Sequence, residues 1–275
     1  MITASDVNKL RQITGAGMMD CKKALTETNG DFEAAIDNLR KKGQKVSEKR
    51  ADRETKEGAV IALISADASY GIIMGLGCET DFVAKNDDYV QFANAVAQRA
   101  LEAKPADREA LLALPMESST VAEQIAEQIG KIGEKIEITD YGMVQGETVV
   151  AYNHSNGKVG VLVALNKKGD AVEAAGKDIT MQIAAMAPIA IDKDDVPEEV
   201  KARELAIGRE QALAEGKPEA ILDKIANGKL EAYYKDATLL NQKFVKDATK
   251  SIRDVLSGVE KDLTVIAFVR VAIGA

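Results

Sequence analysis

The sequence has few of the residues from which enzyme active sites and nucleic-acid platforms are usually built. It contains one histidine, two cysteines and no tryptophan in 275 residues, and aromatic residues make up 4%. The formal net charge is -8, so both the charge and the scarcity of aromatic rings argue against a nucleic-acid partner. The cysteines form neither a CxxC pair nor a zinc-binding spacing, which indicates a reducing, cytoplasmic compartment and predicts no bound metal.

Long apolar runs are also missing. The longest run without a charged residue, 179–191, has 13 residues and includes a proline. A membrane-spanning helix needs roughly 20 apolar residues, so no membrane partner is expected. Residues 1–6 carry no basic stretch followed by an apolar run, and a secretory signal is therefore not expected.

An enzymatic interpretation would have to use Cys21, Cys78 or His154, because nucleophilic catalysis pairs an activated nucleophile with a base. Both cysteines lie in regular patterns and are expected to be small buried hydrophobic residues. His154 falls in a polar turn, where histidine is usually an exposed turn residue. The segment GLGCET lacks the lysine and hydroxyl residues of a phosphate-binding loop. The sequence thus predicts no catalytic residue, no nucleotide site and no cofactor.

Length and charge distribution predict more than one folded unit. A prior of about 150 residues per domain gives roughly two domains. Residues 1–56 carry 12 basic and 9 acidic side chains, a net charge of +3, so the other 219 residues carry -8 minus 3, or -11. We predict a small module with a charged linker over 1–56, followed by two further units over 57–141 and 142–275.

Three short helical patterns fill the first region. Gly15 interrupts the chain after the first pattern, and a second helix is expected over 18–28. Asp31 can cap a third helix, whose basic last turn and Gly43 predict where it ends. The charged stretch 44–57 is expected to be a solvated linker or an exposed helix.

A β-hairpin followed by a helix occurs twice in the rest of the chain. The first hairpin is expected over 60–78 with a helix over 88–103, and the second hairpin over 147–166 precedes a helix that ends at Pro188. The two copies match at an offset of about 87 to 89 residues, which indicates a diverged duplication. The predicted fold class is α+β: a three-helix module, then a core of two related α+β subdomains.

An antiparallel helical hairpin is predicted inside the second subdomain, at about 197–235. Two highly charged helical stretches meet there at a glycine, and Pro218 suits the first turn of the returning helix. The hairpin offers a surface for a homodimer, and the sequence leaves the oligomeric state open. A helix near 249–257 and a strand over 263–271 are expected next, the strand with apolar residues on both faces that predict burial on both sides.

Two segments are hard to explain by packing alone. Met18 and Met19 follow a Gly-Ala-Gly turn, and because helical neighbours point about 100° apart, one of the two is expected to be exposed. Exposed methionine beside Lys22 would suit an acidic partner, although one methionine could be core and the other incidental.

The second segment, TDFVAKN at 80–86, is expected to be a polar loop in the connection where the two copies differ most. It holds one of the few aromatic residues, Phe82. The ring could fold back onto its own domain, or it could be presented beside Asp81 as an anchor for a partner. The residues alone leave both alternatives open.

The same two segments resemble the bacterial elongation factor Ts family. The similarity to the family's N-terminal module is carried by LRQITGAGMMDCKKALTETNGDFEAAIDNLRKKG, and the similarity to its second signature by CETDFVAKND. It continues through YNHSNGKVGVLVAL, GKPEAILDKIANGKL and LLNQKFVKD, and so covers nearly the whole chain. The resemblance implies a ubiquitin-associated (UBA)-like three-helix module and a two-subdomain α+β core with an inserted antiparallel helical hairpin.

The resemblance also implies a function without chemistry of its own. A member of this family is a guanine-nucleotide exchange factor, not an enzyme, for the GTPase elongation factor Tu, in its GDP-bound and nucleotide-free states. It dislodges Mg²⁺ and promotes GDP release so that GTP can bind. The alternative is a passive adaptor or holding chaperone that binds through the three-helix module without changing nucleotide affinity.

Site residues follow from the resemblance position by position. Asp81 and Phe82 are implied to intrude near the partner's magnesium site, and Thr80 and Val83 flank them in the same magnesium-dislocating segment. Further partner contacts are implied for Met18, Met19, Lys22, Lys85, His154 and Val245.

Overall fold

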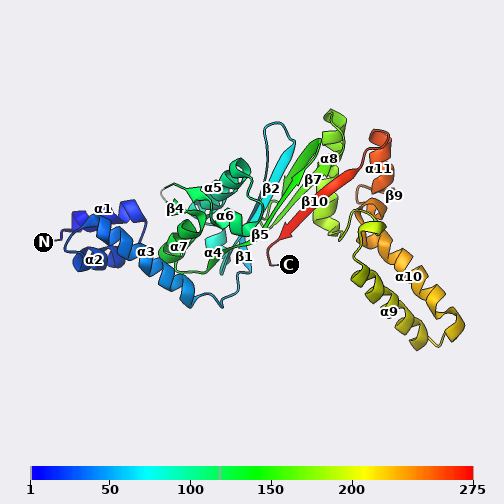
Figure 1. Ribbon diagram of the computed structural model, residues 1–275, viewed down its shortest axis with the longest axis horizontal. Coiled ribbons are helices and arrows are strands. Elements are labelled where there is room, and N and C mark those ends of the chain that lie inside the picture. The colour runs from blue at the N-terminus through cyan, green and yellow to red at the C-terminus, as the bar shows by residue number, and fades with distance from the viewer. Residues whose placement is uncertain (1, 118, 275) are drawn as a thin grey trace.

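The computed structural model describes residues 2–117 and 119–274. Three helices form a small module at one end of an elongated molecule (Figure 1): α1 (Ala4–Thr14), α2 (Met18–Glu27) and α3 (Phe32–Lys49). Gly15 ends α1 with a φ of 66°, a left-handed conformation that glycine adopts without strain. Asp31 caps α3 by accepting a hydrogen bond from the backbone N–H of Ala34 at 3.1 Å. The predicted three-helix module is confirmed.

The end predicted for the third helix at Gly43 is wrong. Helix α3 continues six residues further, to Lys49, and crosses α7 (Val121–Ile132) at Gly43. A Cβ atom added at Gly43 would lie 2.7 Å from the carbonyl oxygen of Ala126 in α7. The glycine therefore permits a close helix crossing and does not stop the helix. The first part of the charged stretch 44–57 is accordingly helical.

The core contains two three-stranded antiparallel sheets of the same strand order. The first has the order β1-β2-β5 and the second the order β6-β7-β10, so each hairpin is completed by a later strand. The strands are β1 (Glu57–Ile64), β2 (Tyr70–Cys78), β5 (Ile136–Gln145), β6 (Thr148–Asn153), β7 (Val159–Leu165) and β10 (Val265–Ala272). The repeated order agrees with the duplication predicted from the sequence.

The two sheets pack face to face, and a contact from the first sheet to the second has an equivalent from the second sheet to the first. A Cβ atom on Gly71 would lie 2.9 Å from Val149, and one on Gly160 would lie 2.7 Å from Val60. Gly71 and Gly160 are 89 residues apart, and so are Val60 and Val149. Equivalent glycines therefore admit equivalent valines, and the apolar layer between the sheets is nearly two-fold symmetric.

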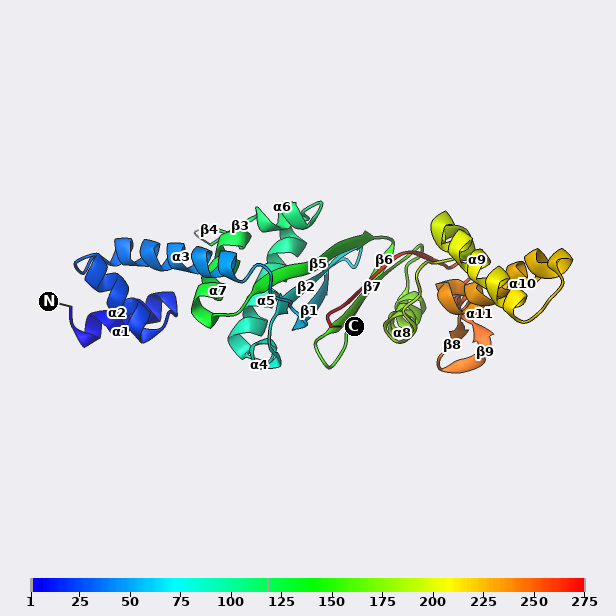
Figure 2. The same cartoon turned by 90° about the horizontal axis from the view of Figure 1, so that it is seen from below.

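Helices cover the outer faces of both sheets (Figures 1 and 2). Helices α5 (Asp87–Ala103) and α7 pack on the first sheet, and α8 (Asp170–Met186) packs on the second. The link from α5 to α7 holds α6 (Arg108–Leu112) and the short strands β3 (Pro115–Met116) and β4 (Ser119–Thr120). Each subdomain thus has its own apolar core on the outer side of its sheet.

The helical hairpin lies at the end of the molecule opposite the three-helix module (Figure 1). Its helices are α9 (Glu198–Ala214) and α10 (Leu222–Ala237), packed closely where Gly208 meets Ala226. Within residues 2–117 and 119–274, no helix combines the length and the apolar composition that a bilayer crossing requires.

In the last part of the chain, one expected element starts later than predicted and another is present. The helix expected near 249–257 begins only at Ile252, as α11 (Ile252–Val259), because 247–251 forms strand β9 (Asp247–Ser251) against β8 (Lys243–Phe244). Both faces of strand β10 contact apolar clusters, as expected: Phe268 packs with the core outside the second sheet, and Val269 and Val271 pack between the two sheets. Burial is partial, since Ile266 is 46% exposed.

Candidate functional site

The segment between β2 and α5 forms a short helix, α4 (Asp81–Ala84), where the sequence predicted a loop. The hydroxyl of Thr80 caps this helix by accepting a hydrogen bond from the backbone N–H of Val83 at 3.4 Å. Val83 and Ala84 pack against the core of the first subdomain. Phe82 points the other way and is 84% exposed. Of the two alternatives for this ring, presentation to solvent is therefore the one that the fold adopts.

Asp81 and Lys85 form an ion pair along α4. The ammonium group of Lys85 donates a hydrogen bond to Oδ2 of Asp81 at 2.7 Å. This hydrogen bond lowers the pKa of Asp81 and raises the pKa of Lys85, and the attraction between the two charges acts in the same direction. Both side chains are well exposed to solvent, where such pairs contribute little to stability. The carboxylate is thus ionised at neutral pH and weakly held.

The base of α4 is held by two glutamates. Oε1 of Glu134 accepts a hydrogen bond from the Thr80 hydroxyl at 2.6 Å, and Oε2 accepts from the backbone N–H of Thr80 at 3.0 Å. Glu79 accepts from the backbone N–H of Lys135 at 2.7 Å and from the guanidinium of Arg50 at 2.6 Å. Sequence reasoning missed these contacts, because no periodic pattern marks a carboxylate that bonds backbone groups 54 to 56 positions away.

The cysteines are buried, as predicted from the sequence. The Sγ of Cys78 donates a hydrogen bond to the carbonyl oxygen of Thr80 at 3.3 Å, and burial raises the pKa of this thiol to about 11. The Sγ of Cys21 donates to the carbonyl oxygen of Ala16 at 3.6 Å. A thiol that stays protonated at neutral pH is a poor nucleophile, so Cys78 stabilises the start of α4 and is not activated for catalysis.

The beginning of α2 exposes both methionines. Met18 is 55% exposed and Met19 73% exposed, and Lys22 lies exposed one turn further on. The prediction that at least one of the two would be exposed is confirmed. Ile13, near the end of α1, is 56% exposed as well. The module therefore exposes apolar side chains from both α1 and α2.

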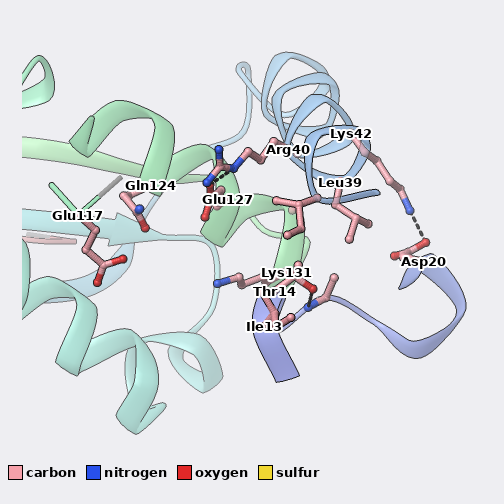
Figure 3. A pocket seen from close by; sticks show the side chains of 14 residues that line it. Ile13, Thr14, Asp20, Leu39, Arg40, Lys42, Glu117, Gln124, Glu127 and Lys131 are labelled. Atoms are coloured by element: carbon pink, nitrogen blue, oxygen red, sulfur yellow. Dashed lines mark hydrogen bonds and ion pairs between the residues drawn. The ribbon is translucent and has the colours of Figure 1, made fainter. Parts of the chain in front are cut away.

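A cavity of about 290 Å³ lies between the module and the core (Figure 3). Ile13 and Leu39 from the module and Lys131 from α7 are among its lining residues. Beside it, Nε of Arg40 in α3 lies 2.8 Å from Oε1 of Glu127 in α7. These contacts, together with the crossing at Gly43, hold the module against the first subdomain.

A second groove connects the module to α4. It is lined by Gly15 of the module, by Phe82 and Val83 of α4, and by Lys131 of α7. The exposed aromatic ring and the turn that precedes Met18 thus border the same hollow. Met18, Met19 and Lys22 do not line this groove, so of the first segment only the turn at Gly15 meets α4 there.

His154 and Val245 lie outside this groove. His154 is exposed in the turn between β6 and β7, with Nδ1 2.7 Å from the hydroxyl oxygen of Tyr152. Val245 is 51% exposed between β8 and β9, and these strands lie far from α4 along the long axis of the molecule (Figures 1 and 2). The structure does not bring Val245 together with Phe82.

Comparison with known proteins identifies the family. The family model described as "Elongation factor TS" matches residues 79–275. A protein named elongation factor Ts from Cytophaga hutchinsonii is 58% identical over 274 residues, which is 99% of each chain. The chain belongs to the elongation factor Ts family. The elongation factor Ts of Amoebophilus asiaticus is 53% identical over 275 residues, and that of Flavobacterium psychrophilum is 46% identical over 273 residues, each alignment covering at least 99% of both chains.

The family model for elongation factor Ts begins at Glu79, directly at the base of α4. The matched region therefore contains α4, the second subdomain and the helical hairpin, and the full-length relatives extend the similarity through the three-helix module. The family resemblance drawn from the two signature segments is confirmed. The roles of single residues and the pairing of two copies through α9 and α10 stay predictions.

Proposed function

We propose that this elongation factor Ts chain is a guanine-nucleotide exchange factor. It binds GDP-bound elongation factor Tu, displaces Mg²⁺ and lets GDP leave so that GTP can enter. The observation that carries the proposal is Phe82, a large apolar side chain that is 84% exposed on a helix held at its base. An exposed aromatic residue on a fixed support is the usual form of an anchor for a protein partner.

The mechanism requires no reaction at a residue of this chain. A GTPase holds GDP and Mg²⁺ through several charge-assisted contacts that must break together, so GDP leaves slowly. A factor that binds the nucleotide-free partner more tightly than the loaded partner must weaken nucleotide binding by the same free energy. Phe82 enters between elements of the partner, and the Asp81 carboxylate disturbs the oxygen ligands around Mg²⁺.

A second set of contacts supplies affinity. Met18 and Met19 are flexible apolar side chains that adapt to a partner surface, and Lys22 adds a positive charge beside them. Binding energy gained there offsets the cost of distorting the nucleotide site. His154 and Val245 are further partner contacts in this proposal.

The test is release of a fluorescent GDP from elongation factor Tu in a stopped-flow instrument at saturating factor. Phe82→Ala should slow GDP release by roughly tenfold or more. The ring is buried only in the complex with the distorted partner, and truncating it removes the contacts made there. Leu213→Ala is the matched control, since Leu213 is also an exposed apolar residue, 62% exposed, but lies on α9 in the helical hairpin.

Two results would count against the proposal. If the rate of GDP release were the same for Phe82→Ala, Leu213→Ala and the unaltered chain, the ring of Phe82 would have no role in release. A saturating amount of the unaltered chain that binds elongation factor Tu without accelerating GDP release would favour the passive adaptor or holding chaperone instead.

A further inference from the structure

At the base of α4, side-chain hydrogen bonds connect the two chain segments that leave the paired strands β2 and β5. The antiparallel ladder of β2 and β5 ends just before Glu79 on one strand and just after Lys135 on the other. Extended in the same register, it places Glu79 opposite Lys135 and Thr80 opposite Glu134. These residues do bond, but through side chains: the Glu134 carboxylate accepts from the backbone N–H of Thr80, and the Glu79 carboxylate accepts from the backbone N–H of Lys135. A backbone ladder would bond only one of two consecutive pairs, so the side chains connect the chain segments at both positions.

Glu134 makes the larger share of these contacts. It follows Gly133, whose left-handed conformation ends α7 and turns the chain toward β5. Its carboxylate accepts three hydrogen bonds, from the hydroxyl of Thr80 at 2.6 Å, the N–H of Thr80 at 3.0 Å and the N–H of Glu79 at 3.1 Å. Hydrogen bonds to an ionised acceptor are roughly twice as strong as neutral ones.

The second glutamate connects the same point to the N-terminal module. Oε1 of Glu79 accepts hydrogen bonds from the backbone N–H of Lys135 and from the guanidinium of Arg50. Arg50 is the residue that caps the end of α3. Burial alone would raise the pKa of Glu79, but these two donors outweigh it and the pKa is lowered. The carboxylate therefore stays charged, and the end of α3 is tied to the start of α4.

Helix α4 depends on this support. It has four residues, and a helix of that length is unstable by itself. The free-energy cost of forming the first helical turn is recovered only when many more residues extend the helix. Phe82 is so exposed that its own packing adds little to hold it in place. The direction in which the ring points is consequently set by the rest of α4, through the packing of Val83 and Ala84 on the core and through the contacts of Thr80 at the start of the helix.

We infer that Glu134 is a positioning residue: by accepting three hydrogen bonds at the base of α4, it fixes the direction in which Phe82 is presented. This inference rests on the proposed function, since presentation matters only if the ring engages a partner. Glu134 does not contact the partner in this proposal and acts through Thr80.

The experiment compares Glu134→Ala with Glu123→Ala. Glu123 is the matched control, because its carboxylate accepts from the N–H and the hydroxyl of Thr120 in the same way but caps the distant end of α7. At saturating factor, Glu134→Ala should slow GDP release about tenfold, while affinity for nucleotide-free elongation factor Tu falls less. Glu123→Ala should leave the release rate unchanged.

A second measurement needs no partner. The amide protons of Glu79 and Thr80 should exchange with solvent at least about tenfold faster in Glu134→Ala than in the unaltered chain, whereas Glu123→Ala should not affect them. Glu134→Gln, which keeps one acceptor oxygen, should restore part of the release rate. Unchanged amide exchange, or a release rate unchanged by Glu134→Ala while the unaltered chain is active, would overturn the inference. Failure of the unaltered chain to accelerate release would instead overturn the proposed function, and the exchange data would still report on Glu134.

Discussion

Asp81 and Phe82 are neighbours on one turn of α4, but different forces act on them. Asp81 pairs with Lys85 at the other end of the turn, whereas the ring of Phe82 is surrounded mainly by solvent. Exposed ion pairs are weak, so the pair keeps Asp81 charged without confining it strongly. A charged carboxylate and a large apolar ring are thus accessible side by side, a combination suited to entering a site that holds a cation.

We expect the carboxyl group of Asp81 to titrate below its ordinary pKa of 3.8, because Lys85 donates a hydrogen bond to the charged form. Its contribution to stability is present above the unfolded-state pKa and is lost as the pH falls through the lowered value. In Lys85→Met the pKa of Asp81 should rise toward 3.8, as followed by carboxyl-carbon NMR. Asp67 is the control: hydrogen bonds from Ser65 and Ser69 lower its pKa to about 2, and Lys85→Met should not change it. An Asp81 pKa that is the same in both proteins would contradict the assigned pair.

At the scale of elements, the crossing of α3 and α7 shows that helix packing can override a local helix-end signal. Glycine after a basic turn is typical of a helix end, yet α3 passes through Gly43 without a break. The backbones of the two helices meet there, with Gly43 against Ala126 and Gly130. The N-terminal module is therefore joined to the core by a continuous helix.

Gly43→Ala should destabilise the protein although alanine is the better helix former. The intrinsic gain of up to about 1 kcal/mol is outweighed by a Cβ that would lie 2.7 Å from a backbone oxygen, and overpacking of this kind costs about 1 to 3 kcal/mol. Gly228→Ala in α10 is the control, because nothing lies within 4 Å of its added Cβ, and it should be neutral or stabilising. Urea unfolding of both variants measures the difference. Equal stabilisation by the two changes would show that the crossing is looser than described.

At the scale of the whole molecule, the surfaces proposed for the partner belong to separate parts of the fold. Met18 and Met19 lie on the three-helix module, and Phe82 lies on the first subdomain. Helix α3, the Arg40–Glu127 pair and the Arg50–Glu79 pair connect these parts. Because these parts are held at a fixed separation, Met18 and Met19 can supply affinity for the partner while Phe82 distorts the partner's nucleotide site.

The double change Met18→Ala and Met19→Ala should weaken the complex with elongation factor Tu by about tenfold or more, because both side chains are exposed and available for contact. The rate of GDP release at saturating factor should stay within about twofold, since the ring that distorts the partner is intact. Met186→Ala, at the end of α8, is the matched control and should leave the affinity unchanged. Titration calorimetry with release kinetics separates the two effects. A lower release rate at unchanged affinity would show that the module takes part in distortion.

Most of the architecture could be predicted from local patterns. Helix caps such as Asp31, turn glycines such as Gly15 and the repeated hairpin-plus-helix pattern depend on neighbours in the chain, and the structure places them where the sequence indicated. Errors arose where another segment decided the outcome. Gly43 lies inside α3 where that helix packs closely on α7, and residues 247–251 form a strand because they pair with β8.

The candidate site was predicted in part. The scarcity of aromatic residues drew attention to Phe82, and two adjacent methionines after a turn predicted exposure at the start of α2. The glutamates at the base of α4 were missed, because their partners are brought close only when β2 and β5 pair.

The sequence by itself determined most of the helices, the two core hairpins, the duplicated order and the family, because caps, turns, apolar periods and signature segments are properties of residues close together in the chain. Only the tertiary structure decided that Phe82 points outward, that Glu134 holds the helix bearing it, and that the module's turn and α4 border one groove. Those outcomes depend on contacts between segments tens of residues apart, and the free energy of such contacts exists only after the sheets and helices have packed.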